Sequence, residues 1–316
     1  MREGRGASGE RRMSKSTLLF GLYLSVAAAQ TGTPEATSLL GKPLHPAPIS
    51  AEARKTLEGN LKSAEVEYAK NPDDADATIW VGRRIAYLGR YREAIARFSD
   101  GIRKHPGDPR LYRHRGHRYI TVRELPNAIA DFSKAAELIA GRPDQIEPDG
   151  QPNARNIPTS TLNSNIYYHL ALAHYLSGDV EQAADAWRRC MAFSRNPDMQ
   201  VATSYWYYLA LSRLGKKAEA AAVLAPIAAD MDIIENGSYH KLLRMFKGEL
   251  TPESLLASGA GLDAVTTRYG IAAWHMANGR QQQGVALLRE IVDGYPQQWP
   301  AFGYIAAEAD LARLKR

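Results

Sequence analysis

The sequence predicts an all-α protein, an α-solenoid of helix-turn-helix repeats with two interrupting inserts. The first observation is a 34-residue period: residues 75–108 are followed without a gap by residues 109–142, and the two stretches align. The second is a set of small and aromatic residues one period apart: Gly82 and Gly116, Ala94 and Ala128, and Phe98 and Phe132. Two helices approach closely only where a small residue faces a large one, so this pattern is typical of stacked helical hairpins.

The elements follow in order along residues 50–313. A leading helix is expected after residue 50, and a closing helix near residue 313. Between them we predict repeats near residues 75–108, 109–142, 164–197, 201–232 and 265–298. Helix-start signals support these limits, since Asp108 suits an N-cap and Pro109 the first helical turn. The two end helices are expected as caps, because each repeat leaves an apolar face that a neighbour must cover.

Two inserts interrupt the repeats, at residues 141–163 and 233–262. The first contains four prolines and three asparagines, which predicts a long polar loop. The second contains the helical stretch "SYHKLLRMFKGEL" and a short helix opened by "TPESLL". Loops longer than roughly 12–15 residues in a compact domain are often functional, so the first insert is a candidate part of a site.

The first 29 residues have the three-part organisation of an export signal. A basic opening precedes the apolar run from Thr17 to Ala29, and small residues suit cleavage after about Ala29. The run is shorter than the roughly 20 residues that cross a bilayer, so we expect no stable membrane span. Either Met1 or Met13 serves as the start in this interpretation. We expect an exported protein, periplasmic or secreted, with a flexible linker over residues 30–49.

The charge gives little support to nucleic-acid binding. Of the net charge of +6, the first 29 residues contribute +3, from five basic and two acidic side chains, so the remainder carries +3. No motif of a nucleic-acid reader accompanies it. A single cysteine, Cys190, excludes an internal disulfide and cannot by itself supply a zinc site. No sequence motif of a zinc protease, serine hydrolase or P-loop enzyme occurs, and we expect no cofactor.

The basic stretch "LYRHRGHRY", residues 111–119, contributes to a predicted groove. Tyr112 and Gly116 share the helix face that packs inside the repeat, whereas Arg113, His114 and His117 share the opposite face. That second face of each repeat's first helix is expected to line a concave groove, basic at its start and aromatic beyond. The predicted peptide-binding residues are Arg83, Tyr87, Arg110, Arg113, His114, His117, Tyr168, His169 and Tyr205. Because arginine forks pair with planar carboxylates, we expect the groove to bind an acidic segment or a C-terminal carboxylate.

The first insert is expected to contact this cluster. Arg115 lies on the flank of this helix, and a guanidinium near a packed interface needs a carboxylate. The insert supplies Glu147 and Asp149. We therefore predict that the insert folds back on the groove, with Glu147, Asp149 and Arg155 as its contact residues.

The repeats resemble the tetratricopeptide repeat (TPR) superfamily over roughly residues 50–313. The stretches "RLYRHRGHRYI", "IEPDGQPNARNIPTSTL" and "AFGYIAAEA" look like those of a group of uncharacterised exported bacterial TPR proteins. A more distant similarity, near "FKGELTPESLL", is to the outer-membrane TPR lipoprotein adaptors that scaffold peptidoglycan hydrolases. In place of their lipid-acceptor cysteine this sequence has Gln30. The resemblance implies binding of partner peptides rather than chemistry.

Several interpretations remain open. The first is a non-enzymatic adaptor for a protein or peptide partner; the alternative is a small-ligand-binding protein or hydrolytic enzyme with a pocket under the insert at residues 141–163. A third is a scaffold that self-associates through its terminal helices. A metal bound by His114, His117 and His169 is disfavoured, because the neighbouring arginines repel a cation.

Overall fold

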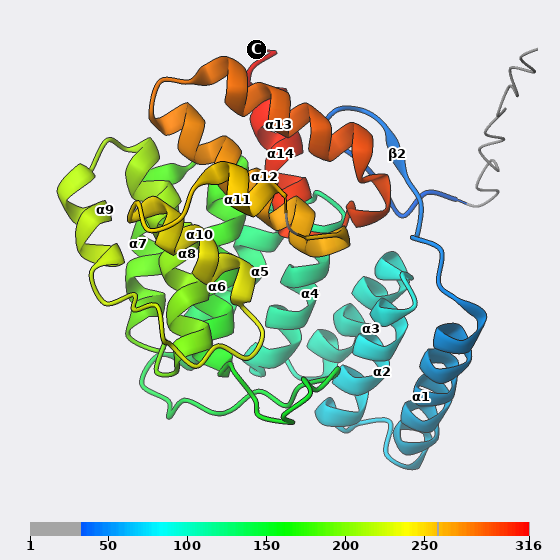
Figure 1. The fold of residues 1–316 in the computed structure, drawn as a ribbon. Coiled ribbons are helices and arrows are strands. Elements are labelled where there is room, and N and C mark those ends of the chain that lie inside the picture. Colours follow the sequence, from blue (N-terminus) through cyan, green and yellow to red (C-terminus); the bar gives the residue numbers. More distant parts are fainter. Residues whose placement is uncertain (1–32, 258, 316) are drawn as a thin grey trace, which may run out of the picture. The chain divides into compact units, whose positions relative to one another are not determined.

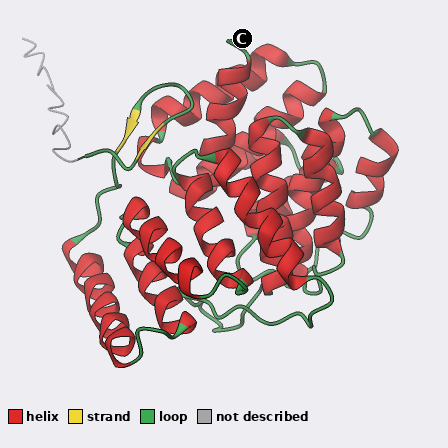
Figure 2. Cartoon of the chain, turned by 180° about the vertical axis from the view of Figure 1, so that it is seen from behind, coloured by secondary structure: helices red, strands yellow, loops and turns green. Residues whose placement is uncertain are grey.

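The computed structural model describes residues 33–257 and 259–315, and the predicted export signal lies outside them. The all-α solenoid is confirmed, and Figure 2 shows helices throughout with one pair of short strands. Among the described residues, no helix combines the length and apolarity needed to cross a membrane. The elements are β1 (Ala36–Thr37), β2 (Pro43–Leu44), α1 (Ala51–Lys70), α2 (Ala75–Tyr87), α3 (Tyr91–Lys104), α4 (Pro109–Thr121), α5 (Leu125–Ile139), α6 (Leu162–Ser177), α7 (Val180–Met191), α8 (Pro197–Arg213), α9 (Lys217–Leu224), α10 (Gly237–Phe246), α11 (Pro252–Leu256), α12 (Gly261–Ala277), α13 (Gln281–Gly294), the 3₁₀ helix η1 (Pro296–Gln298) and α14 (Phe302–Arg313).

The helices pair as hairpins where the sequence places repeats. The pairs are α2 with α3, α4 with α5, α6 with α7, α8 with α9, and α12 with α13, and consecutive helices pack from α1 to α9 (Figure 1). Asp74, Asp108 and Asn196 accept backbone N–H groups at the starts of α2, α4 and α8, so local caps fix where each repeat begins. The second insert forms α10 and α11, and α10 packs on α8 and α12.

Glycine sets the distance between the two helices of a hairpin. A Cβ added at Gly82 would lie 2.6 Å from Cζ of Phe98, and one at Gly116 would lie 2.9 Å from Cε2 of Phe132. Both phenylalanine rings are buried. The small-against-large pattern in the sequence therefore corresponds to direct ring-on-backbone packing inside the first two hairpins.

Replacing Gly82 by alanine tests this packing. Alanine usually stabilises a helix relative to glycine, but here the added methyl group meets the Phe98 ring, so we expect a loss of about 1–3 kcal/mol in the free energy of unfolding. Urea unfolding followed by circular dichroism measures it. Gly107→Ala is the control, because nothing lies within 4 Å of a Cβ at that exposed turn. A gain in stability from Gly82→Ala would contradict the packing.

The expectation of a flexible linker over residues 30–49 is wrong for its described part, which forms an ordered strap over residues 33–46. In the strap, β1 pairs with β2 in antiparallel register, Ala36 opposite Leu44, and both side chains are buried. The indole Nε1 of Trp299 donates to the backbone oxygen of His45 at 2.6 Å. The proline-rich composition of the strap resembles that of a linker. Its few apolar side chains and its backbone nevertheless contact the C-terminal part of the chain.

The closing helix α14 bonds back to the second hairpin. Arg123, in the turn between α4 and α5, has φ of 66°, and its Nε lies 3.0 Å from a carboxylate oxygen of Glu308 in α14. Its Nη2 also donates to the backbone oxygen of Trp299 at 2.8 Å. The two charged side chains are 2% and 1% exposed. This buried ion pair fixes α14 against helices distant in the sequence.

Candidate functional site

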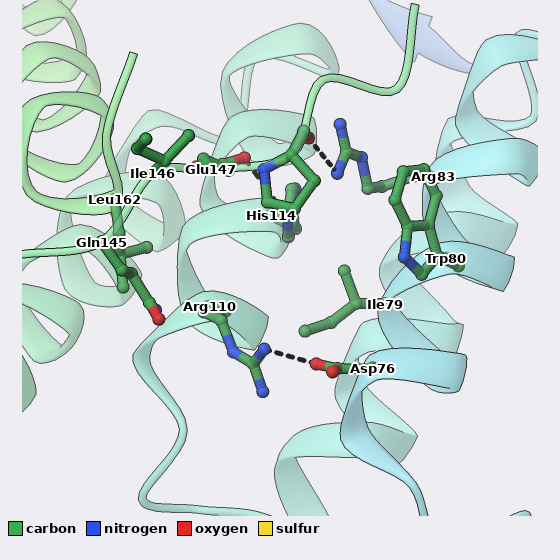
Figure 3. Close-up of a pocket in the computed structure, with 11 residues that line it drawn as sticks. Asp76, Ile79, Trp80, Arg83, Arg110, His114, Gln145, Ile146, Glu147 and Leu162 are labelled. Atoms are coloured by element: carbon green, nitrogen blue, oxygen red, sulfur yellow. Dashed lines mark hydrogen bonds and ion pairs between the residues drawn. The ribbon is translucent and has the colours of Figure 1, made fainter. Parts of the chain in front are cut away.

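The candidate site lies where α2, α4 and the first insert meet (Figure 3). It contains a cavity of about 170 Å³. Its walls come from α2, α4, the insert and the start of α6: Asp76, Ile79, Trp80, Arg83, Arg110, His114, Gln145, Ile146, Glu147, Pro148 and Leu162. Of the lining residues, Arg110 pairs with Asp76 and also with Asp108.

Residues 146–150 of the insert, "IEPDG", lie along this site, and we call them the docked segment. Arg83 Nη1 donates to the backbone oxygen of Pro148 at 2.8 Å, and Arg84 Nη1 donates to that of Gly150 at 2.9 Å. Both guanidinium groups lie over the ring of Trp80, at 4.5 and 5.0 Å from its centroid. Two arginines of α2, stacked on Trp80, thus bind the main chain of the segment. These two bonds do not depend on which side chains the segment carries.

The side chain of Glu147 is the anchor of the docked segment. Its carboxylate lies 3.0 Å from Nε of Arg113 and 3.5 Å from Nε2 of His114, and it accepts a hydrogen bond from Nδ2 of Asn165 at 3.0 Å. Glu147 and Arg113 have side chains that are only 10% and 11% exposed. A charge pair this buried is favourable only when further hydrogen bonds support it. Asn165 supplies one to the carboxylate, and Nη1 of Arg113 lies 3.1 Å from Nδ1 of His114.

Both ends of the docked segment are fixed. Ile146 forms a β-bridge with Thr161, and the backbone N–H of Leu162 donates to Gln145 at 2.8 Å. At the other end Gly150 is buried, and a Cβ there would lie 2.7 Å from Nη2 of Arg83 and 2.9 Å from Cζ of Tyr87. The last position of the segment therefore accepts only glycine unless those side chains move.

Three histidines lie beside the segment. The rings of His117 and His169 are 4.6 Å apart, and Phe302 of α14 lies 5.5 Å from His117. Burial, reinforced by neighbouring arginines, lowers the pKa of His114 and His117 well below the usual value and lowers the pKa of His169 to about 3. The rings are therefore uncharged at neutral pH, and the positive charge of the site comes from its arginines.

Some predicted groove residues are core residues instead. Tyr205 is fully buried, stacked on Tyr239 of α10 at 4.4 Å between ring centroids. Tyr168 and His169 are 6% and 5% exposed. The prediction that these three line an open groove is wrong, because α10 and α14 cover that part of the face. His114 is also buried, beneath Glu147.

The insert contacts differ in part from the expectation. Glu147 meets the basic cluster, but Arg115 binds Asp131 of its own hairpin, with Nη2 donating at 2.7 Å, and makes no contact of this kind with the insert. Arg155 pairs with Asp232, directly before the second insert, at 2.8 Å, and the hydroxyl of Thr159 donates to Glu235 of the second insert at 2.8 Å. Asp149 accepts the backbone N–H of Gln151 at 2.9 Å.

Arg84 was missed by sequence reasoning. It lies beside the face assigned to the groove, and nothing in the repeat pattern shows that a backbone oxygen of the insert comes within its reach. Asn165 does lie on that face, but an asparagine there gave no reason to expect a partner for Glu147. Both contacts depend on the path of the insert, which has no periodicity from which to predict it.

The described residues include no group of three or more histidine, cysteine or acidic side chains placed to hold a metal ion. Cys190 is buried, with Sγ 3.4 Å from the backbone oxygen of Ser164, and burial raises its thiol pKa to about 11. It therefore stays a neutral thiol inside the third hairpin.

The stacked helical hairpins, the first two of them built on a glycine that faces a phenylalanine, define the fold as an α-solenoid. No protein-family model and no curated protein matches the chain. Among solved structures, the chain is similar to the crystal structure of YrrB, described as a TPR protein with an unusual peptide-binding site. The TM-score is 0.43 and the identity 12%, over 79% of this chain and 99% of that one. The function is therefore inferred from the site itself.

Proposed function

We propose that this protein is a non-enzymatic adaptor that binds an acidic segment of a partner protein at the site formed by α2, α4 and α6. The observation that supports this most strongly is the docked segment. It is held as a bound peptide would be, with two main-chain oxygens on Arg83 and Arg84 and one carboxylate on Arg113 and Asn165. A partner segment of similar chemistry would take its place.

The contacts define what such a partner needs. It needs a glutamate at the position of Glu147, because Arg113 and Asn165 converge there. Three positions later a glycine fits best, because a Cβ at the position of Gly150 must displace the ends of the Arg83 and Tyr87 side chains. Between them a proline is accepted, since the contacts of Pro148 use its carbonyl oxygen and it has no N–H to satisfy. If the export signal functions as expected, the partner is met outside the cytoplasm.

The docked segment is also a tethered competitor. A short tether gives a local concentration in the millimolar range, so a free peptide of equal affinity must exceed that concentration to displace it. The protein as it stands should therefore bind such a peptide weakly. Weakening the segment's own hold should expose the site without altering the residues that bind the partner.

The test is a fluorescence-anisotropy titration with the capped peptide DQIEPDGQ, which copies residues 144–151. Gly150→Val is the opened variant, because the new side chain meets Arg83 and Tyr87 and pushes the segment away. We expect it to bind the peptide at least about tenfold more tightly than the unchanged protein does. The same peptide with glutamine in place of its glutamate should lose binding, because Arg113 then has no charge to pair with.

The matched control is Gln151→Val, an exposed neighbour whose contact with Asp149 uses only its backbone. It should behave as the unchanged protein. The proposal fails if the opened, folded variant shows no binding, or if the glutamate and glutamine peptides bind it equally well.

A further inference from the structure

We propose that a second cavity, beneath the docked segment, binds a small oxyanion, a carboxylate or phosphate group, through Arg83, Arg113 and Arg118. This cavity has a volume of about 190 Å³. It is lined by those arginines together with His117, Tyr87 and Asp149, among others. The inference concerns a ligand other than the partner segment and does not depend on peptide binding.

The charges around the cavity do not balance. Arg113 is paired with Glu147, and Arg83 uses one nitrogen on a neutral carbonyl oxygen. Arg118 is different: in the part of the chain that the structure describes, its guanidinium group has no ion pair and no hydrogen bond. Its nearest defined contact is the ring of Tyr91, 5.5 Å from the centroid. Burial lowers the pKa of Arg118 to about 10, so the group is still charged at neutral pH.

The side chain of Arg118 is partly buried. A guanidinium group that has lost much of its water normally has a protein acceptor, because leaving its donors unsatisfied is costly. The carboxylates available are Glu147, which is paired with Arg113, and Asp149 on the cavity wall. Three guanidinium groups against two carboxylates leave an excess of one positive charge. An anion in the cavity would neutralise this excess and give Arg118 its acceptor.

The size and donors of the cavity fit a small oxyanion. At roughly 30 Å³ for a water molecule in the liquid, 190 Å³ has room for a phosphate ion or a short carboxylate with some water. Guanidinium forks match the geometry of both groups. His117, kept neutral by burial, adds a ring N–H donor at the same wall. The docked segment lies over the cavity, so the bound anion would be shielded from solvent.

The experiment is isothermal titration calorimetry of the full chain with sodium phosphate and, separately, sodium malonate, each against sodium chloride of equal ionic strength. We expect saturable binding of at least one of the two. The arm that binds identifies the source of the oxyanion. Arg118→Gln should weaken that binding at least about tenfold, because it removes a charged donor. Arg195→Gln is the control, since Arg195 is exposed and is not one of the residues that line the cavity.

A second variant keeps the test decisive if Arg118→Gln does not fold. Asp149→Asn removes the carboxylate that lines the cavity, which itself makes no ion pair. Because this negative charge repels an anion, anion binding should tighten about fivefold without it. Absence of saturable binding of both anions in the unchanged protein and in Asp149→Asn would overturn the inference. So would equal affinity in folded Arg118→Gln and in the unchanged protein.

Discussion

Replacing Glu308 by alanine is expected to lower the free energy of unfolding by about 3–5 kcal/mol, because it leaves the buried guanidinium of Arg123 without its counter-charge. The other two groups that Arg123 contacts, the backbone oxygen of Thr121 through Nη1 and that of Trp299 through Nη2, remain as acceptors, but neither is charged. The substitution also removes the acceptor of the Leu39 N–H, which donates to Glu308 at 3.2 Å. Both the strap and α14 should therefore loosen.

The measurement is urea unfolding with a linear extrapolation to water. Glu137→Ala is the matched control: Glu137 pairs with Lys134 on the surface of α5, and exposed pairs of this kind contribute less than about 1 kcal/mol. The double variant Arg123→Met with Glu308→Leu should recover much of the loss, because it removes both charges together. A folded Glu308→Ala variant within 1 kcal/mol of the unchanged protein would show that the pair is not holding α14.

Acidification from pH 7 to pH 5.5 is expected to destabilise the protein by about 3 kcal/mol, through His114, His117 and His169. The unfolded chain takes up protons on these rings below its histidine pKa of about 6.5, whereas the native rings, with lowered pKa values, stay neutral. The unfolded state therefore binds more protons, and stability falls as pH falls. Each ring contributes up to about 1 kcal/mol per pH unit below 6.5.

Urea unfolding at pH 7.5, 6.5 and 5.5, at constant ionic strength, measures this dependence. Carboxylates with lowered pKa values, such as Asp185, act only at lower pH and do not contribute in this window. His169→Asn should remove about a third of the slope that the three buried rings contribute. Partly buried His275, whose pKa is also lowered by burial, adds to the remaining slope. Stability that is constant or rising between pH 7 and pH 5.5 would contradict the burial of uncharged histidines.

The hairpins were predictable from sequence because their determinants are local and periodic. The spacing of Gly82 and Phe98, repeated at Gly116 and Phe132, describes a contact within one hairpin, and caps such as Asp108 mark where helices start. The fold-back of the first insert was predictable only in outline, from the charges it shares with α4. Which of the nearby arginines pairs with Glu147 depends on the path of the loop.

The contacts that the sequence did not predict are between distant segments. Tyr205 has the spacing of a groove residue, but α10 of the second insert packs over it, about 35 residues further along the chain. Arg115 pairs with Asp131 of the next helix in the same hairpin. Its charge is therefore neutralised without a carboxylate from the insert. Ala36 and Leu44 became part of the core only because the C-terminal helices lie beside them. Such pairings leave no periodic signal in one sequence.

The central claim is that the docked segment occupies a peptide-binding site and is displaced by a partner. Hydrogen–deuterium exchange of the full chain, with and without saturating capped DQIEPDGQ peptide, tests it most directly. The Glu147 N–H donates to Ser160 in the docked state, so displacement should speed amide exchange in residues 146–151 while exchange in the rest of the fold stays unchanged or slows. Peptide binding that leaves exchange in residues 146–151 unchanged would contradict the claim, since the peptide would then be bound elsewhere.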